Sequence, residues 1–141
     1  MATPAAKPAF QPPAIPWLTP QPLGEVLPLG PGLEHLPALH NGLRRLCDDA
    51  TVQAVLAFGS RGRGSGRADS DLDLAVITRE ASLDPALKTK RWLHYRELLG
   101  VLTVDVDLVV QGAADAERLA GSRWHVMGDV AREGRVLYVA S

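Results

Sequence analysis

The chain of 141 residues has a single cysteine, Cys47, and no long apolar run. One cysteine cannot make an intrachain disulfide, a CxxC redox motif or a cysteine-based zinc site. No apolar stretch approaches the length needed to cross a membrane, and the N-terminus lacks the charged-then-apolar order of a signal peptide. The sequence therefore predicts a protein of the cytoplasm, with one domain large enough to bury a core.

The chain also lacks a strong charge of either sign. It has 15 lysines and arginines against 16 aspartates and glutamates, which gives a formal net charge of −1 and a pI near 6.4. Affinity for DNA depends mainly on basic side chains that neutralise phosphates. The composition therefore argues against a nucleic-acid-binding protein, although a local basic loop could still contact a polynucleotide.

Proline is almost confined to the N-terminus, where ten of the eleven prolines lie between residues 1 and 37. Proline removes a backbone donor and blocks regular helix and strand. We expect residues 1–32 to form a disordered or extended arm, followed by one folded domain over residues 33–141. The alternative is an ordered arm whose apolar side chains pack on the domain or on a partner, namely Phe10, Ile15, Trp17, Leu18, Val26 and Leu27.

The most informative stretch covers residues 58–76, FGSRGRGSGRADSDLDLAV. The apolar run of residues 52–58 is typical of a buried strand, and it ends at Gly59. Glycine allows a sharp turn there, and the free N–H groups of a helix that begins near Ser60 would attract phosphate. Positive charge for the phosphates would come from three arginines of the following loop, Arg61, Arg63 and Arg67.

Two aspartates, Asp71 and Asp73, follow that loop at the start of a second apolar run. Residues two apart in a strand point to the same face, so these carboxylates should lie side by side. Carboxylate oxygens suit Mg²⁺, which also takes oxygens from a nucleoside triphosphate. A third acid would complete the site and accept a proton from an attacking hydroxyl. The strand candidate of residues 103–110 offers Asp105 or Asp107, and we favour Asp107.

The spacing of apolar residues predicts the remaining elements. Leucines at steps of three and four indicate a helix over residues 33–49. Ser82 or Asp84 can cap a helix that begins at Pro85. Trp124 is expected in the core, beside a surface histidine. The result is an α/β (α+β) fold, a small mixed β-sheet flanked by helices, with strands at 52–58, 71–78, 103–110 and 135–139 and helices at 33–49, 85–99, 113–120 and about 124–130.

The spacing of Gly-Ser, ten residues and Asp-x-Asp resembles the minimal nucleotidyltransferase family of the DNA polymerase β-like superfamily. The resemblance extends over roughly residues 33–138 and includes the Arg63-Gly64 pair, the Asp69-Ser70 lead-in and the tail of residues 131–138. It implies a nucleotidyltransferase fold. It also implies that the nucleotide is bound by Gly59, Ser60, Arg63 and Ser70, and that Mg²⁺ binding and catalysis fall to Asp71, Asp73 and Asp107.

The resemblance implies an activity as well. Small members of this family are often paired with a helical HEPN protein as antitoxin and toxin, which suggests transfer of AMP from ATP to a hydroxyl of such a partner. Little chain follows the motif to build a second, substrate-choosing domain. Two alternatives stay open. One is an aminoglycoside-type small-molecule nucleotidyltransferase that assembles as a homo-oligomer, and the other is an inactive module that binds nucleotide or a partner.

Overall fold

A computed structural model describes residues 14–141, and its centre is a mixed four-stranded sheet in the order β3-β2-β1-β4. β1 (Val52–Phe58) runs antiparallel to both β2 (Leu72–Thr78) and β4 (Arg135–Val139). β3 (Val106–Gly112) lies at the edge and is parallel to β2. The predicted α/β fold is therefore confirmed, with a single parallel pair inside an otherwise antiparallel sheet.

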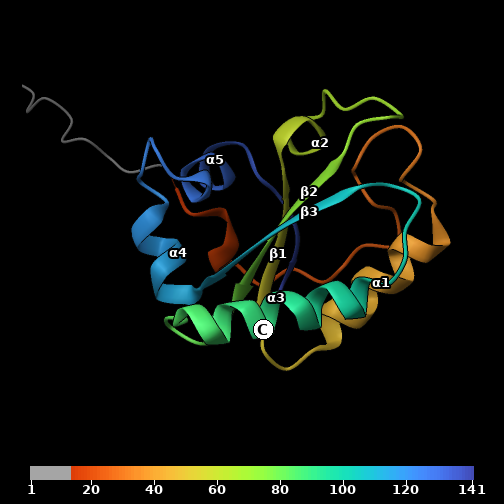
Figure 1. The fold of residues 1–141 in the computed structure, drawn as a ribbon. Helices are drawn as coiled ribbons and strands as arrows, with labels where there is room; N and C mark the ends of the chain where they lie inside the picture. The colour runs from red at the N-terminus through yellow and green to blue at the C-terminus, as the bar shows by residue number, and fades with distance from the viewer. Residues whose placement is uncertain (1–13) are drawn as a thin grey trace, which may run out of the picture.

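Helices cover both faces of this sheet (Figure 1). α1 (Pro37–Asp48) and α3 (Pro85–Leu99) pack together across one face, and α4 (Ala113–Leu119) and α5 (Val126–Glu133) lie against the other. The short helix α2 (Gly59–Arg63) follows β1 directly, and a 3-10 turn, η1, covers Pro16–Leu18. The sheet thus has a core on each side, and the candidate site lies at the end of β1, next to α2.

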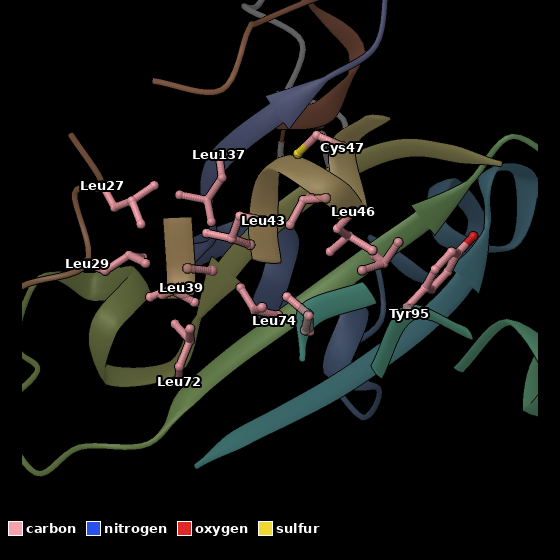
Figure 2. Close-up of a cluster of buried hydrophobic side chains, with 14 of the residues drawn as sticks. Leu27, Leu29, Leu39, Leu43, Leu46, Cys47, Leu72, Leu74, Tyr95 and Leu137 are labelled. Atoms are coloured by element: carbon pink, nitrogen blue, oxygen red, sulfur yellow. The ribbon is translucent and has the colours of Figure 1, made fainter. Parts of the chain in front are cut away.

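Strand alternation divides the buried side chains into these two cores. Leu39, Leu43 and Leu46 of α1 are fully buried against Leu72 and Leu74 of β2 in the first core (Figure 2). Cys47 lies at its margin, and burial, followed by the charge of Asp48, raises the pKa of its thiol to about 12. The lone cysteine is therefore an inert core thiol at neutral pH. The second core joins Leu56, Ala75, Ile77, Met127 and Val130.

Several element boundaries agree with the sequence, but the first helix begins at Pro37 and not at residue 33. The capping residue of α3 also agrees. The side chain of Asp84 accepts a hydrogen bond of 2.7 Å from the Leu87 amide, as an N-cap does. The third strand differs, because it begins at Val106 rather than at residue 103. β3 pairs only with β2, and that ladder opens at Leu72 opposite Val106. Residues 103–105 lie before this ladder as a loop, apart from the Asp105 carbonyl, which accepts from the Leu72 amide.

The expectation that Trp124 lies in the core is wrong, because the side chain is 95% exposed. It precedes α5, whose buried face is formed by Met127, Val130 and Ala131. His125 fills the N-cap position instead, and its Nδ1 accepts a hydrogen bond of 3.0 Å from the Met127 amide. The predicted helix start at about residue 124 lies two residues too early, in the connection before α5.

The described part of the proline-rich segment, residues 14–32, is packed rather than free. Trp17 joins the second core, and Leu27 and Leu29 are fully buried in the first, as Figure 2 shows for the two leucines. Gln21 forms an isolated antiparallel bridge with Val139 at the end of β4. A disordered arm is therefore wrong for these residues, while Leu18 and Val26 are exposed and Phe10 lies outside the described residues. A domain boundary at residue 32 stays a prediction.

None of the helices described between residues 14 and 141 is long and apolar enough to cross a membrane.

Candidate active site

The register of the sheet places two carboxylates side by side. Asp73 of β2 lies directly opposite Asp107 of β3 in the parallel pair, and opposite Phe58 of β1 in the antiparallel pair. Both aspartates share the face of Ala75, Ile77 and Val109, where the second core ends. The predicted pairing of an Asp-x-Asp acid with an acid of the third strand is thus what the backbone register produces, and Asp107 rather than Asp105 stands in that position.

Gly59 lies against the carboxylate of Asp73. Its backbone has a φ of +64°, and a Cβ built on it would overlap Asp73 Oδ2 and come within 3.2 Å of Asp73 Cγ. Only glycine combines this left-handed conformation with this close contact. The sequence indicated a glycine that lets a ligand approach the main chain. In the structure, the space that a side chain at position 59 would fill is occupied by the Asp73 carboxylate.

The pKa of Asp73 is raised above its usual value. Burial is the largest cause, followed by the charge of Asp107 and a carboxyl-to-carboxyl hydrogen bond with it, while Asp71 adds a smaller repulsion. Arg63 opposes the shift by its positive charge. A raised pKa here means that the protein holds negative charge at this point at a cost in free energy. A cation or a proton at the site would relieve that cost.

Asp71 and Asp105 are exposed and lie just before the two strands begin. Both line a groove of about 550 Å³, together with Asp107 and with the chain that leaves α3. The apolar part of its wall comes from Leu99, Val101, Leu102, Val104 and Val106. Asp71 therefore interacts with the acid pair only through its charge, and it lies on the wall of this groove.

A divalent cation is compatible with the acid pair. Within residues 14–141, no three His, Cys, Asp or Glu side chains converge closely enough to hold a metal by themselves. Mg²⁺, however, is commonly bound by one or two carboxylates, with waters and substrate phosphates in its other positions. Asp73 and Asp107 provide such a pair, and the raised pKa of Asp73 shows the electrostatic cost that a cation would remove. Of the three carboxylates expected from sequence, Asp73 and Asp107 form a close pair and Asp71 acts on Asp73 by its charge, while their role as metal ligands stays a prediction.

Arg61 has a different role from the one expected. The side chain is 1% exposed, and each of its five N–H groups donates to a backbone carbonyl. A guanidinium has five N–H donors in all, so none is left for a phosphate. The expectation that Arg61 adds charge for the nucleotide is wrong, because the charge lies inside the protein. The acceptors are the carbonyl oxygens of Leu29, Pro31, Arg67, Ala68 and Ser70.

The other residues expected to bind nucleotide lie around the same turn. Arg63 forms an ion pair of 3.1 Å with Glu133 of α5, in which both side chains are nearly half exposed. An exposed pair of this kind is weak, so Arg63 can leave it for a phosphate. Ser60 is partly exposed at the start of α2, and Ser70 Oγ accepts a hydrogen bond of 2.8 Å from the Arg67 amide. Ser70 thus closes the loop and keeps its hydroxyl hydrogen for another partner.

The sequence did not indicate Glu133 as a site residue, and Arg96 was only one of four cations on the helix of residues 85–99 that could reach a triphosphate. Glu133 stands beside Arg63 because α5 packs against α2, a contact between segments 70 residues apart. Arg96 lines the groove near Asp107 and donates a hydrogen bond of 2.8 Å to the Val106 carbonyl. Both residues looked like solvent-facing charges on amphipathic helices, and no local motif distinguishes them from such charges.

The mixed sheet with α2 after β1 and an acid pair on β2 and β3 is a nucleotidyltransferase fold. The sequence profile of the nucleotidyltransferase domain matches residues 39–135, which is more than half of the chain. The chain belongs to this nucleotidyltransferase family. None of the curated protein sequences compared with the chain matches it.

Several solved structures are similar to the chain at low scores. A toxin–antitoxin structure with AMP-PNP is 26% identical with a TM-score of 0.48, over 75% of this chain and 76% of the other. A mutant of the toxin–antitoxin pair MntA–HpeT is 24% identical with a TM-score of 0.48, over the same shares. A candidate nucleotidyltransferase from Sulfolobus solfataricus is 15% identical with a TM-score of 0.45, over 72% and 86%. The family assignment rests on the profile match.

Proposed function

We propose that this nucleotidyltransferase transfers a nucleoside monophosphate, AMP from ATP, to a hydroxyl group of a partner protein. The observation that carries the proposal is the in-register pair of Asp73 and Asp107, packed against Gly59 at the turn into α2. Two crowded carboxylates at the end of a buried sheet are costly unless they bind something. A triphosphate with its cation supplies what such a pair lacks.

In this proposal the triphosphate lies over the turn formed by Gly59 and Ser60, where main-chain N–H groups and the serine hydroxyl can donate to it. Arg63 exchanges its exposed partner Glu133 for a phosphate oxygen. Ser70 steadies the loop that leads to the acids. These residues position the α-phosphate and stabilise charge, which is the main contribution of a protein to phosphoryl-group transfer.

Asp73 and Asp107, with Asp71 beside them, would hold Mg²⁺, which when bound neutralises charge on the triphosphate. Asp107 is exposed and points toward the groove, so it can accept the proton of the acceptor hydroxyl. The freed oxygen forms a bond to the α-phosphorus. The bond from that phosphorus to the oxygen bridging to the β-phosphate breaks, and pyrophosphate leaves with the electron pair.

The groove beside the acids supports a protein as the acceptor. It is open, it measures about 550 Å³, and one wall is apolar chain that includes the almost fully exposed Val101. An exposed apolar edge next to a reactive site is typical of a surface that another chain covers. The motif resemblance points in the same direction, to a helical HEPN-type toxin for which this chain would be the antitoxin.

The test is a labelling assay with α-³²P-ATP, Mg²⁺ and a purified helical HEPN-type protein as the acceptor. We expect the label on that protein with α-³²P-ATP and no label with γ-³²P-ATP, because only AMP transfer retains the α-phosphate. Asp73→Asn should abolish the label, while Asp105→Asn, an acid in the same groove but out of register, should retain its kcat. Full labelling by a folded Asp73→Asn variant, or label from the γ-phosphate, would contradict the proposal.

A small cationic acceptor is a second candidate, because three carboxylates line the groove: Asp71, Asp105 and Asp107. An aminoglycoside carries several ammonium groups that such a wall would attract. The same assay decides between the two acceptors, since a small product is separated from protein by filtration. Binding of ATP without transfer to either acceptor would instead favour the inactive module.

A further inference from the structure

The guanidinium of Arg61 joins two segments that are far apart in the chain. On one side it donates to Arg67, Ala68 and Ser70, in the loop that leads to the aspartates. On the other side its Nη1 donates to Leu29 and Pro31, at 2.7 Å and 3.2 Å. In Figure 1 the orange N-terminal chain passes beside the yellow-green loop after α2, where these bonds lie.

Two glycines shape the N-terminal side of this contact. Each acceptor carbonyl belongs to the residue just before a glycine with positive φ, Gly30 at +84° and Gly32 at +87°. Left-handed backbone at both places turns the peptides so that the carbonyls of Leu29 and Pro31, two positions apart, accept from the same Nη1 atom. The sequence Leu29-Gly30-Pro31-Gly32 is thus a specific acceptor for Arg61, which an ordinary proline-rich linker would not be.

The contact matters energetically because it satisfies a buried charge. A buried charge is costly unless its donors are all satisfied, and no ion pair among residues 14–141 includes Arg61. Five carbonyls replace the missing counter-charge, two of them from the N-terminal segment. Without the N-terminal segment, two N–H groups of the buried Arg61 would have no partners. The present conformation of the loop of residues 64–70 would then be higher in free energy.

We propose that the segment Leu27–Leu33 is a positioning strap of the active site: through Arg61 it holds the loop of residues 64–70, and thereby fixes Asp71 and Asp73 for the nucleotide. The strap is anchored independently, since Leu27, Leu29 and Leu33 are buried in the first core. The link to nucleotide binding rests on the proposed function, whereas the effect on the loop does not. Residues 27–33, which lie outside the motif of residues 59–73, thus help to position the aspartates of that motif.

The sharpest variant is Gly30→Ala combined with Gly32→Ala. A Cβ at Gly30 would lie 3.8 Å from Arg61 Nη1, and one at Gly32 would lie 3.8 Å from the Ala68 carbonyl oxygen, so both methyls fit. Only the left-handed backbone disfavours the two alanines, and it lowers the population of the native strap conformation by roughly tenfold per site. Gly24→Ala, three residues before the strap, is the matched control, because φ is not positive there and the nearest atom is 3.4 Å away. Arg61→Lys, with three donors instead of five, tests the other side.

Two measurements on the full chain decide the matter. The first is hydrogen exchange at the Ser70 and Leu72 amides, which bond to the carbonyls of Arg67 and Asp105. We expect exchange about tenfold faster in the double glycine variant, and unchanged in Gly24→Ala. The second is transfer kinetics, where we expect KM for Mg-ATP to rise by about tenfold with kcat recovered at saturation, because binding energy then restores the loop.

Each outcome has a meaning. A folded double variant with unchanged exchange at Ser70 and Leu72 and unchanged KM would overturn the strap. Loss of the entire fold in Gly30→Ala alone would overturn it too, since the segment would then support the whole core and not the loop. If the natural protein transfers nothing, the proposed function fails, while the exchange comparison still decides whether the strap holds the loop.

Discussion

Gly59 and Asp73 are in contact so close that no side chain can stand at position 59 without moving the carboxylate. Gly59 also has a left-handed backbone, so two independent reasons require glycine. The glycine of the Gly-Ser turn and the second acid of the Asp-x-Asp motif are therefore a single unit. The spacing between the two motifs has a physical basis in this contact.

Gly59→Ala should lower transfer activity strongly. The methyl group would push the Asp73 carboxylate away from Asp107, and a shift of about 1 Å at a reacting centre can cost about 100-fold in rate. Steady-state kinetics of the labelling reaction measures the loss. Gly121→Ala is the control, because no atom lies within 4 Å of its added Cβ. Equal kcat/KM in Gly59→Ala and the natural chain would show that Asp73 does not need this position.

Asp73→Asn should stabilise the metal-free protein at neutral pH. Burial and the nearby Asp107 raise the folded-state pKa of Asp73, so between the unfolded and folded values the native protein binds more protons and loses stability as pH rises. The gain from the substitution should therefore be present at pH 7, diminish as pH falls through the raised folded pKa, and be absent below the usual value of 3.8. Urea unfolding at a series of pH values, with EDTA present, measures it. A destabilised variant at pH 7 would contradict the stated cause.

Asp49 should show the opposite pH dependence. Burial alone would raise its pKa, but hydrogen bonds from Thr51 and His94 outweigh burial and lower it. The Thr51 amide donates at 2.9 Å, and His94 Nε2 lies 2.6 Å from the other carboxylate oxygen. Asp49→Asn should cost about 2 kcal/mol at pH 7, the value for hydrogen bonds to a charged group.

The stabilisation by Asp49 is present above its unfolded pKa and is lost as pH falls through the lower, folded value. The difference between the natural chain and Asp49→Asn should therefore shrink only below about pH 3.8. Unfolding free energies from pH 2.5 to pH 7 test this. Asp48→Asn, the neighbouring acid on α1, is the matched control. A difference that stays constant down to pH 2.5 would show that the carboxylate charge is irrelevant there.

Two side chains of α3 should protect the edge strand β3 from pairing with another strand. Trp92 Nε1 donates to the Leu108 carbonyl at 3.0 Å, Arg96 donates to the Val106 carbonyl, and the guanidinium stands 5.7 Å from the indole ring centre. These contacts cover carbonyls of β3 that could pair with another strand. Trp92→Phe with Arg96→Ala should cost about 1 kcal/mol and increase self-association, measured by light scattering. Leu93→Ala, an exposed residue of the same helix, should leave both quantities unchanged.

Local patterns predicted much of this fold. The strands 52–58 and 135–139 and the start of α3 at Pro85 were predicted at their observed positions, because apolar runs, a terminal glycine and an N-cap are local signals. The site acids followed from alternation within one strand. Their partner on β3 needed the register of a parallel pair, which no local pattern contains. The sequence favoured Asp107 over Asp105, and the register of the parallel pair places Asp107 opposite Asp73.

Arg61 shows what a local pattern cannot contain. An arginine among glycines is typical of an exposed loop, and only the fold reveals that two distant segments supply its carbonyl acceptors. The packing of residues 14–32 was one of two alternatives that the sequence left open, and the structure buries Trp17 and Leu27 as that alternative expected. Prolines correctly predicted the lack of regular structure, but burial of Leu27 and Leu29 depends on a surface formed by α1, β2 and β4. Trp124 was expected in the core as part of an apolar helix pattern, whereas its position before α5 leaves it outside.

The central claim is that Asp73 and Asp107 form one cation-binding pair. The most direct measurement is the affinity for Mn²⁺, a spectroscopic substitute for Mg²⁺, by electron paramagnetic resonance in the presence of a non-hydrolysable ATP analogue. We predict that Asp107→Asn weakens Mn²⁺ binding at least about tenfold, the effect of losing one of two carboxylate ligands, and that Asp105→Asn stays close to the natural chain. Equal affinities in Asp107→Asn and the natural chain would contradict the claim.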